Sequence, residues 1–183
     1  SDLPQGCTPA GLNTAERVAG GRAERVGRRP TGPEGRDRLV GWLVGTGVTS
    51  NSVIYVKDRA TVGIGTGEQD RVGVAEIARD KAYRKLADRL AFERHGVIYS
   101  SLADEAARRA IDAEVAAEHG GLRGAVMVSD AFFPFRDGVE VGLKEGVTAV
   151  IQPGGALNDH QVIEACNEAG ATMVFTGERS FKH

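Results

Sequence analysis

Residues 129–138 read Ser-Asp-Ala-Phe-Phe-Pro-Phe-Arg-Asp-Gly, and they separate two elements of different kinds. Residues 124–128 before them, Gly-Ala-Val-Met-Val, form the short apolar run typical of a buried parallel strand. Residues 139–146 after them have the pattern of a helix. The stretch is therefore predicted to be a strand-to-helix loop, and such loops bind ligands in open α/β sheets because helix N-termini and backbone donors converge there.

This loop holds three of the chain's six Phe residues, together with an Arg and two Asp. Aromatic faces beside charged groups are suited to the wall of a pocket for a heterocycle, with the charges fixing its edges. The alternative is structural: the three Phe side chains plug the end of the sheet and Asp137 caps the following helix. Composition and spacing leave both interpretations open.

The pattern after the loop continues as a strand over 147–151, a turn over 152–155, a helix over 159–169 and a strand over 172–175. Asn158 or Asp159 is placed to cap that helix. An alternation of strand and helix at this spacing favours parallel strands with helices on the faces of the sheet.

The upstream half adds an antiparallel hairpin, which makes the predicted sheet mixed. We predict the following elements: a helix over 34–45, strands over 52–57 and 60–65 joined by a tight turn at Asp58-Arg59, a helix over 72–94, and a helix from Ser101, as N-cap with Glu105 near the capping-box position, to about His119. The predicted fold class is α/β, a three-layer α/β/α arrangement.

Residues 1–33 differ in composition, because Gly, Pro and Arg interrupt any periodic pattern. We predict an arm or linker over 1–33, with a short strand near residues 24–26, and one domain over 34–183. The basic cluster Arg25, Arg28 and Arg29 is suited either to phosphate or, as is more common, to a solvated charged segment.

Composition excludes several classes of function. At 183 residues with 41% hydrophobic and 26% charged residues, the chain has the make-up of one globular domain. A net charge of -2 gives no electrostatic case for nucleic acid, and no apolar run approaches the roughly 20 residues of a membrane helix. Cys7 and Cys166 lie far apart with no signal-peptide pattern, which favours a reduced, cytoplasmic setting. The scattered Cys and His residues predict no metal site.

The loop also carries a resemblance to a known family. The string at 129–137, the run Gly-Val-Thr-Ala-Val-Ile-Gln-Pro-Gly-Gly at 146–155, and Val-Phe-Thr-Gly-Glu-Arg at 174–179 with a terminal Phe-Lys-His resemble the closing third of AICAR transformylase. That is the formyl-transfer half of a bifunctional purine-biosynthesis enzyme whose other half is IMP cyclohydrolase. Ser-Asn-Ser-Val at 50–53 and Gly-Ile-Gly-Thr-Gly-Glu-Gln-Asp-Arg at 63–71 match in the same order. The resemblance covers residues 36–183.

The resemblance implies a cytidine-deaminase-like version of the fold without zinc, and formyl transfer from 10-formyltetrahydrofolate to AICAR. It implies two sets of ligand contacts. For the nucleotide they are Asn51, Phe132, Arg179 and His183; for the folate they are Arg71, Pro134, Phe135 and Asp137. In this family the sites form where two subunits meet, so a homodimer, or a complementary transformylase chain, is the implied partner.

Two of these assignments have simple structural alternatives. Asn51 sits where an amide often caps a turn, and Arg179 stands near a chain end where charged side chains are commonly solvated. Each of these residues is therefore interpreted in two ways until geometry decides.

One departure from the family bears on catalysis. The proton-transfer pair of the family is a Lys-His in a Lys-His-x-x-Pro-x-Gly motif of the first of two transformylase repeats, and that motif is missing here; the catalytic residues are therefore unknown. We expect one part of an active site, completed by a first repeat from elsewhere. The chain begins at Ser1 without Met, which is expected either of a trimmed chain or of a fragment of a longer polypeptide. The alternatives are a non-catalytic folate- or nucleotide-binding or regulatory module, and a small complete transformylase that uses other residues.

Overall fold

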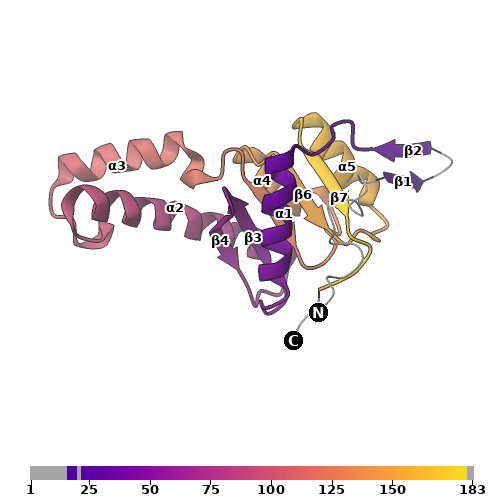
Figure 1. Ribbon diagram of the computed structural model, residues 1–183, viewed down its shortest axis with the longest axis horizontal. Helices are drawn as coiled ribbons and strands as arrows, with labels where there is room; N and C mark the ends of the chain where they lie inside the picture. The colour runs from indigo at the N-terminus through magenta and orange to yellow at the C-terminus, as the bar shows by residue number, and fades with distance from the viewer. Residues whose placement is uncertain (1–15, 20–21, 181–183) are drawn as a thin grey trace.

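The computed structural model describes residues 16–19 and 22–180, and a five-stranded sheet lies at its centre (Figure 1). The strand order is β4-β3-β5-β6-β7. β3 pairs antiparallel with both β4 and β5, whereas β5, β6 and β7 run parallel. The strands are β3 (Val53–Lys57), β4 (Ala60–Gly65), β5 (Val126–Ser129), β6 (Ala149–Gln152) and β7 (Thr172–Phe175). The predicted mixed sheet with a parallel end is confirmed.

Helices cover both faces of this sheet. They are α1 (Gly32–Gly45), α2 (Arg71–His95), α3 (Glu105–Ala117), α4 (Arg136–Lys144) and α5 (Asp159–Glu168), with short 3-10 helices η2 (Tyr99–Ser101) and η3 (His119–Gly121). On one face, Trp42 of α1 packs with Ile54 and Val128. On the other, Val139 of α4 and Ile163 of α5 belong to the larger cluster of buried side chains. The chain is thus a three-layer α/β/α domain, while the cytidine-deaminase-like version stays an expectation from the resemblance.

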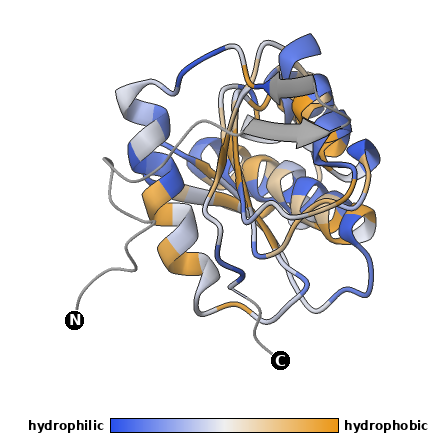
Figure 2. Cartoon of the chain, turned by 90° about the vertical axis from the view of Figure 1, so that its right-hand side faces the viewer, coloured by the Kyte–Doolittle hydropathy of each residue, from blue (hydrophilic) through white to orange (hydrophobic). Residues whose placement is uncertain are grey.

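Alternation of side chains along the strands explains the two cores. In β3 successive side chains point to opposite faces, so Ile54 joins the α1 side and Tyr55 joins the side of α2 and α4. Figure 2 shows the central strands largely in the hydrophobic colour, with hydrophilic stretches on the helices around them. Burial on both faces is what a continuous apolar strand such as β5 requires.

Close packing of α2 on β4 depends on glycine. A Cβ added at Gly63 would overlap the carbonyl oxygen of Ala78, and one at Gly65 would overlap that of Val74. The two glycines therefore let the helix backbone approach the strand directly. This contact fixes the start of α2, and with it Arg71, relative to the sheet.

The hairpin turn matches its prediction. Asp58 and Arg59 have φ values of 52° and 64°, the left-handed pair that a two-residue turn of type I′ needs. Their amides donate to the carboxylate of Asp37 on α1, at 3.0 and 2.7 Å. The turn is therefore fastened to the helix that covers the neighbouring face.

The predicted start of α3 is wrong. Asp104, not Ser101, is the N-cap, and its carboxylate accepts from the amides of Ala106 and Ala107. Ser101 instead ends η2, because Leu102 donates back to the carbonyl of Tyr99 and closes that turn first. Smaller differences lie at element ends: β5 begins at Val126 rather than at residue 124, and β6 at Ala149 rather than at 147.

The predicted arm contains a hairpin where one short strand was expected. β1 (Glu16–Ala19) pairs antiparallel with β2 (Arg22–Arg25), and the two lie beside α5 (Figure 1). Beyond it, the guanidinium of Arg28 donates to the carboxylate of Glu34 and to the carbonyl of Thr148. Arg28 is thus bound within the chain rather than simply solvated. The division at residue 33 stays a prediction.

Candidate ligand-binding site at the carboxyl end of the sheet

Four chain segments meet at one edge of the sheet. The parallel strands β5, β6 and β7 all end there, and β3 begins there because it is antiparallel to β5, with Val53 opposite Ser129. The loops at this edge are residues 130–135, 153–158 and 176–180, together with residues 49–52 that enter β3. We call it the carboxyl edge. It is where open α/β sheets bind ligands.

Arg71 is the buried cation of this edge. It is the first residue of α2, and its Nη1 lies 2.6 Å from Asp130 Oδ1 in an ion pair whose side chains are 7% and 1% exposed. The same nitrogen donates to Ser129 Oγ and to the carbonyl of Ser52, and Nη2 donates to Asn51 Oδ1 at 2.8 Å. The guanidinium is thus held by four oxygens of the protein. The predicted folate contact of Arg71 remains a prediction.

Asn51 is held by the same network. Its Nδ2 donates to the carbonyls of Glu68 at 2.9 Å and Gln69 at 3.0 Å, while its Oδ1 accepts from Arg71. The amide therefore fixes the loop that leads into α2, which is the structural interpretation of this residue. The side chain is half-buried, so it also borders the edge.

Phe132 and Arg179 come together although they are far apart in the sequence. The guanidinium carbon of Arg179 lies 4.6 Å from the centre of the Phe132 ring, a cation–π arrangement. Phe132 is half-buried and Arg179 is exposed. Two of the residues predicted to contact a nucleotide thus form one aromatic and cationic surface, and Arg179 is not merely a solvated charge.

The three Phe residues of the loop take different positions. Phe133 is completely buried and packs in the core below the edge. Phe135 is 57% exposed, and Pro134 is exposed as well. Only Phe133 acts as a plug, so the interpretation in which all three rings close the sheet end is wrong for Phe135.

Asp137 lies in the first turn of α4 but does not cap it in the expected way. The N-cap is Phe135, which offers no side-chain hydrogen bond, and Asp137 Oδ1 accepts from the amide of Gly138 at 2.8 Å. A carboxylate in the first turn still interacts favourably with the helix dipole. The side chain of Asp137 is exposed, as are Pro134 and Phe135 shortly before it in the sequence. All three are therefore accessible to a ligand.

Neighbouring residues tie the loop in place. Arg136 forms ion pairs with Glu140 of α4 and Glu168 of α5. Asn158 Nδ2 donates to the carbonyl of Pro134 at 3.1 Å, which links the loop after β6 to the loop after β5. Sequence reasoning missed this role of Asn158; an amide beside a predicted helix start indicated only a cap. His183, predicted near the site, lies outside the described residues.

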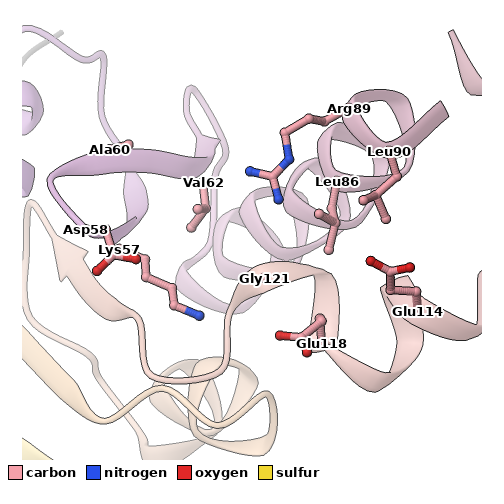
Figure 3. Close-up of a pocket in the computed structure, with 10 residues that line it drawn as sticks. All are labelled: Lys57, Asp58, Ala60, Val62, Leu86, Arg89, Leu90, Glu114, Glu118 and Gly121. Atoms are coloured by element: carbon pink, nitrogen blue, oxygen red, sulfur yellow. The ribbon is translucent and has the colours of Figure 1, made fainter. Parts of the chain in front are cut away.

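A hollow lies away from this edge. It has a volume of about 420 Å³ and opens between the hairpin, α2 and the end of α3 (Figure 3). In the figure Lys57 and Glu118 reach toward the same open space, and Leu86 and Leu90 of α2 border it as well. Of the predicted site residues that the structure describes, none lines it. The lining of this hollow carries both positive and negative side chains, so it does not indicate one class of ligand.

Other titratable groups in the described residues are structural. Burial raises the pKa of the Cys166 thiol to about 12, which leaves it protonated and unreactive at neutral pH. Burial, together with the hydrogen bond that its hydroxyl donates to Glu145, raises the pKa of Tyr83 to about 12. His119 Nδ1 lies 3.1 Å from the same Glu145 carboxylate, so this cluster joins α2 and η3 to the end of α4.

Within residues 16–19 and 22–180, no group of three or more His, Cys, Asp or Glu side chains has the geometry to hold a metal ion. Over the same described part of the chain, none of the helices has the length and apolar character needed to cross a bilayer.

These observations define a three-layer α/β domain with a candidate ligand site at the carboxyl ends of its strands. The family model described as the AICARFT/IMPCHase bienzyme matches residues 14–81 of the 183. This match supports membership of the chain in the AICAR transformylase/IMP cyclohydrolase bienzyme family, and with it a role in purine biosynthesis. It contains Asn51 and Arg71 but ends within α2, before the loop at 129–138.

Proposed function

We propose that this chain supplies one part of an active site that transfers a formyl group from 10-formyltetrahydrofolate to AICAR. The observation that carries the proposal is the pairing of Phe132 with Arg179 at the carboxyl edge, beside the exposed Pro134, Phe135 and Asp137. An aromatic face next to a guanidinium suits a nucleotide, because the ring packs on the heterocycle and the cation pairs with phosphate or carboxamide oxygens. The exposed Asp137 suits the amino groups of a pterin as a hydrogen-bond acceptor.

The reaction sets three requirements. The amine nitrogen of AICAR forms a bond to the formyl carbon, the bond from that carbon to N10 of the folate breaks, and one proton moves from the amine to N10. The two ligands must therefore be aligned, the proton must be moved, and charge on the formyl oxygen must be stabilised. In this proposal the chain aligns the ligands.

Proton transfer is assigned to a complementary part. The family's Lys-His motif is missing from this sequence, and the buried cation of the edge, Arg71, is already paired with Asp130. A homodimer, or a chain that carries the first repeat, would provide the remaining groups. We place this assembly in the cytoplasm, in keeping with the free, buried thiol of Cys166.

A second candidate is a binding or regulatory module without turnover. The missing Lys-His motif favours a module without turnover, because the residues proposed at the carboxyl edge bind ligands and none of them is proposed to transfer the proton. Both candidates predict ligand binding and differ only in turnover. Formyl transfer by the chain with and without a first-repeat chain, followed as tetrahydrofolate release, distinguishes them.

Calorimetric titration with AICAR and with a 10-formyltetrahydrofolate analogue tests the binding that both candidates share. We expect Arg179→Ala to weaken AICAR binding by about 10-fold or more, since a charge-assisted contact is lost. Arg84→Ala, which removes an exposed Arg from α2, is the matched control and should bind as the wild type does. Equal affinities of all three proteins for AICAR would contradict the proposed site.

Folate binding has its own variant. Asp137→Ala should weaken the folate analogue and leave AICAR binding nearly unchanged, because its carboxylate is exposed and supports only the amide of Gly138. Glu93→Ala on α2 is the control for loss of a surface carboxylate. Loss of the fold in Asp137→Ala, seen by circular dichroism, would instead show that the residue is structural.

A further inference from the structure

Asp130 is a buried carboxylate at the point where β5 ends. The residue is only 3% exposed, and Ser129 before it is fully buried. A buried charge is costly unless it is paired and hydrogen-bonded. Asp130 Oδ1 is paired, with Arg71; Asp130 Oδ2 is buried and has no hydrogen-bond partner among the described residues.

Its bonds reach three separate segments. Oδ1 accepts from Arg71 Nη1 at 2.6 Å and from the amide of Ser52 at 3.1 Å. The backbone amide of Asp130 donates to the carbonyl of Ser52 at 3.4 Å, and its carbonyl accepts from the amide of Ser180 at 3.1 Å. The start of β3, the start of α2 and the segment after β7 are thus joined at one residue.

The joined residues are neighbours of the predicted nucleotide contacts. Ser52 follows Asn51, Ser180 follows Arg179, and Phe132 is two positions beyond Asp130. Three of the four predicted nucleotide contacts, Asn51, Phe132 and Arg179, therefore lie within two positions of Asp130 or of a residue hydrogen-bonded to it. The hydrogen bond between Ser180 and Asp130 thus links the segment that carries Arg179 to the segment that carries Phe132.

We propose that Asp130 is the positioning residue of the nucleotide subsite: it touches no ligand and holds Asn51, Phe132 and Arg179 in register with one another. The inference rests on the proposed function, because it takes these three residues to be nucleotide contacts. It goes further in naming the group on which their mutual geometry depends. Small displacements of binding groups lower affinity and rate strongly.

The first test is Asp130→Asn, which keeps the size of the side chain and an oxygen for Ser52 but removes the charge that pairs with Arg71. We expect AICAR affinity, measured by calorimetry, to fall about 10- to 100-fold. Affinity for the folate analogue should fall less, because Asp130 is bonded to only one of the four predicted folate contacts, Arg71; the other three, Pro134, Phe135 and Asp137, lie beyond the joined segments. A purely structural residue would lower both affinities together, or lower the melting temperature alone, and either result would overturn the proposal.

A second test leaves the buried pair intact, in case Asp130→Asn does not fold. Ser180→Pro removes the amide that donates to Asp130 and also restricts the local backbone, and Ser180→Ala is the control that keeps the amide. We expect Ser180→Pro to lose as much AICAR affinity as Arg179→Ala does, and Ser180→Ala to bind as the wild type does. Wild-type affinity of Ser180→Pro would contradict the proposal.

A ligand-free measurement separates this inference from the proposed function. The Phe132 ring shifts the NMR signals of the Arg179 side chain when the two are 4.6 Å apart. This shift should be present in the wild type and lost in Asp130→Asn and Ser180→Pro. If the wild type binds no AICAR, both proposals fail; if it binds and the variants keep both the shift and the affinity, only the inference fails.

Discussion

The carboxyl edge and the α2–α3 arm, residues 84–117, each contain an ion pair of similar length. The pair at the edge is buried, whereas the pair in the arm is exposed. At the edge, Arg71 and Asp130 are 2.6 Å apart with side chains 7% and 1% exposed. In the arm, which extends away from the sheet (Figure 1), Arg94 and Glu114 are 2.7 Å apart but 43% and 41% exposed. The two distances are nearly equal, but the edge pair is buried and Arg71 has further oxygen partners, whereas the Arg94–Glu114 pair is exposed. Removing one partner of an ion pair is expected to cost most where the other charge is left buried without water.

The largest effect is expected when the buried pair at the carboxyl edge loses its cation. Arg71→Met leaves Asp130 buried without its cation, and we expect the free energy of unfolding to fall by about 3–5 kcal/mol. Arg94→Met removes the exposed partner, and the expected loss is at most about 1 kcal/mol. Urea denaturation of both variants measures the difference. Equal losses would mean that burial does not set the strength of the edge pair.

A smaller effect on stability is expected where the backbone of α2 packs against β4. Gly63→Ala places a methyl group against the carbonyl of Ala78 in α2, and we expect a loss of about 1–3 kcal/mol from strain. Gly35→Ala in α1 is the control, because a Cβ there meets nothing within 4 Å. That change should stabilise the protein by up to about 1 kcal/mol through helix propensity. Thermal unfolding that shows no difference between them would refute the close packing of α2 on β4.

The smallest expected effect concerns a third charged pair, Arg28 and Glu34. Glu34 lies in the first turn of α1. Burial alone would raise the pKa of Glu34, but hydrogen bonds from Arg28 and from the backbone of Thr31 outweigh it and lower the pKa to about 2, from an ordinary value of 4.5. Because the folded-state pKa is depressed, the stabilising contribution is complete above pH 4.5 and is lost as the pH falls toward 2.

Glu34→Gln should therefore cost about 1 kcal/mol at neutral pH, the difference between charged and neutral hydrogen bonds. The stability of the wild type and of this variant, measured by urea denaturation from pH 7 to pH 2, should converge as the pH falls below 4.5. A constant difference over that range would show that the carboxylate charge of Glu34 contributes nothing.

Much of the fold could be predicted because local patterns determine it. The turn at Asp58 and Arg59, the long α2 and the strand over 172–175 are each specified by residues adjacent in the sequence. The start of α3 could not be predicted from the same signals, because Ser101 and Asp104 are both good caps. The turn of η2 uses Ser101 first and leaves the cap to Asp104.

The sequence predicts a ligand site at the carboxyl edge, which stays a prediction, and it gives no sign of the hydrogen bonds within that edge. A loop after a buried strand indicated the carboxyl edge, and the string at 129–138 indicated its residues. The pairing of Arg71 with Asp130 joins residues 59 positions apart, and the hydrogen bond from Asn158 to Pro134 spans 24. Such contacts depend on how strands order themselves in the sheet, which no local pattern specifies.

The measurement that tests the central claim most directly is an NMR titration of the chain with AICAR, followed by backbone amide and side-chain shifts. We expect saturable changes at Asn51, Phe132 and Arg179, with little change at Arg89 and Glu118, which line the hollow between the hairpin, α2 and α3. Changes confined to that hollow, or no saturable change at any residue, would contradict the assignment of the carboxyl edge as the nucleotide site.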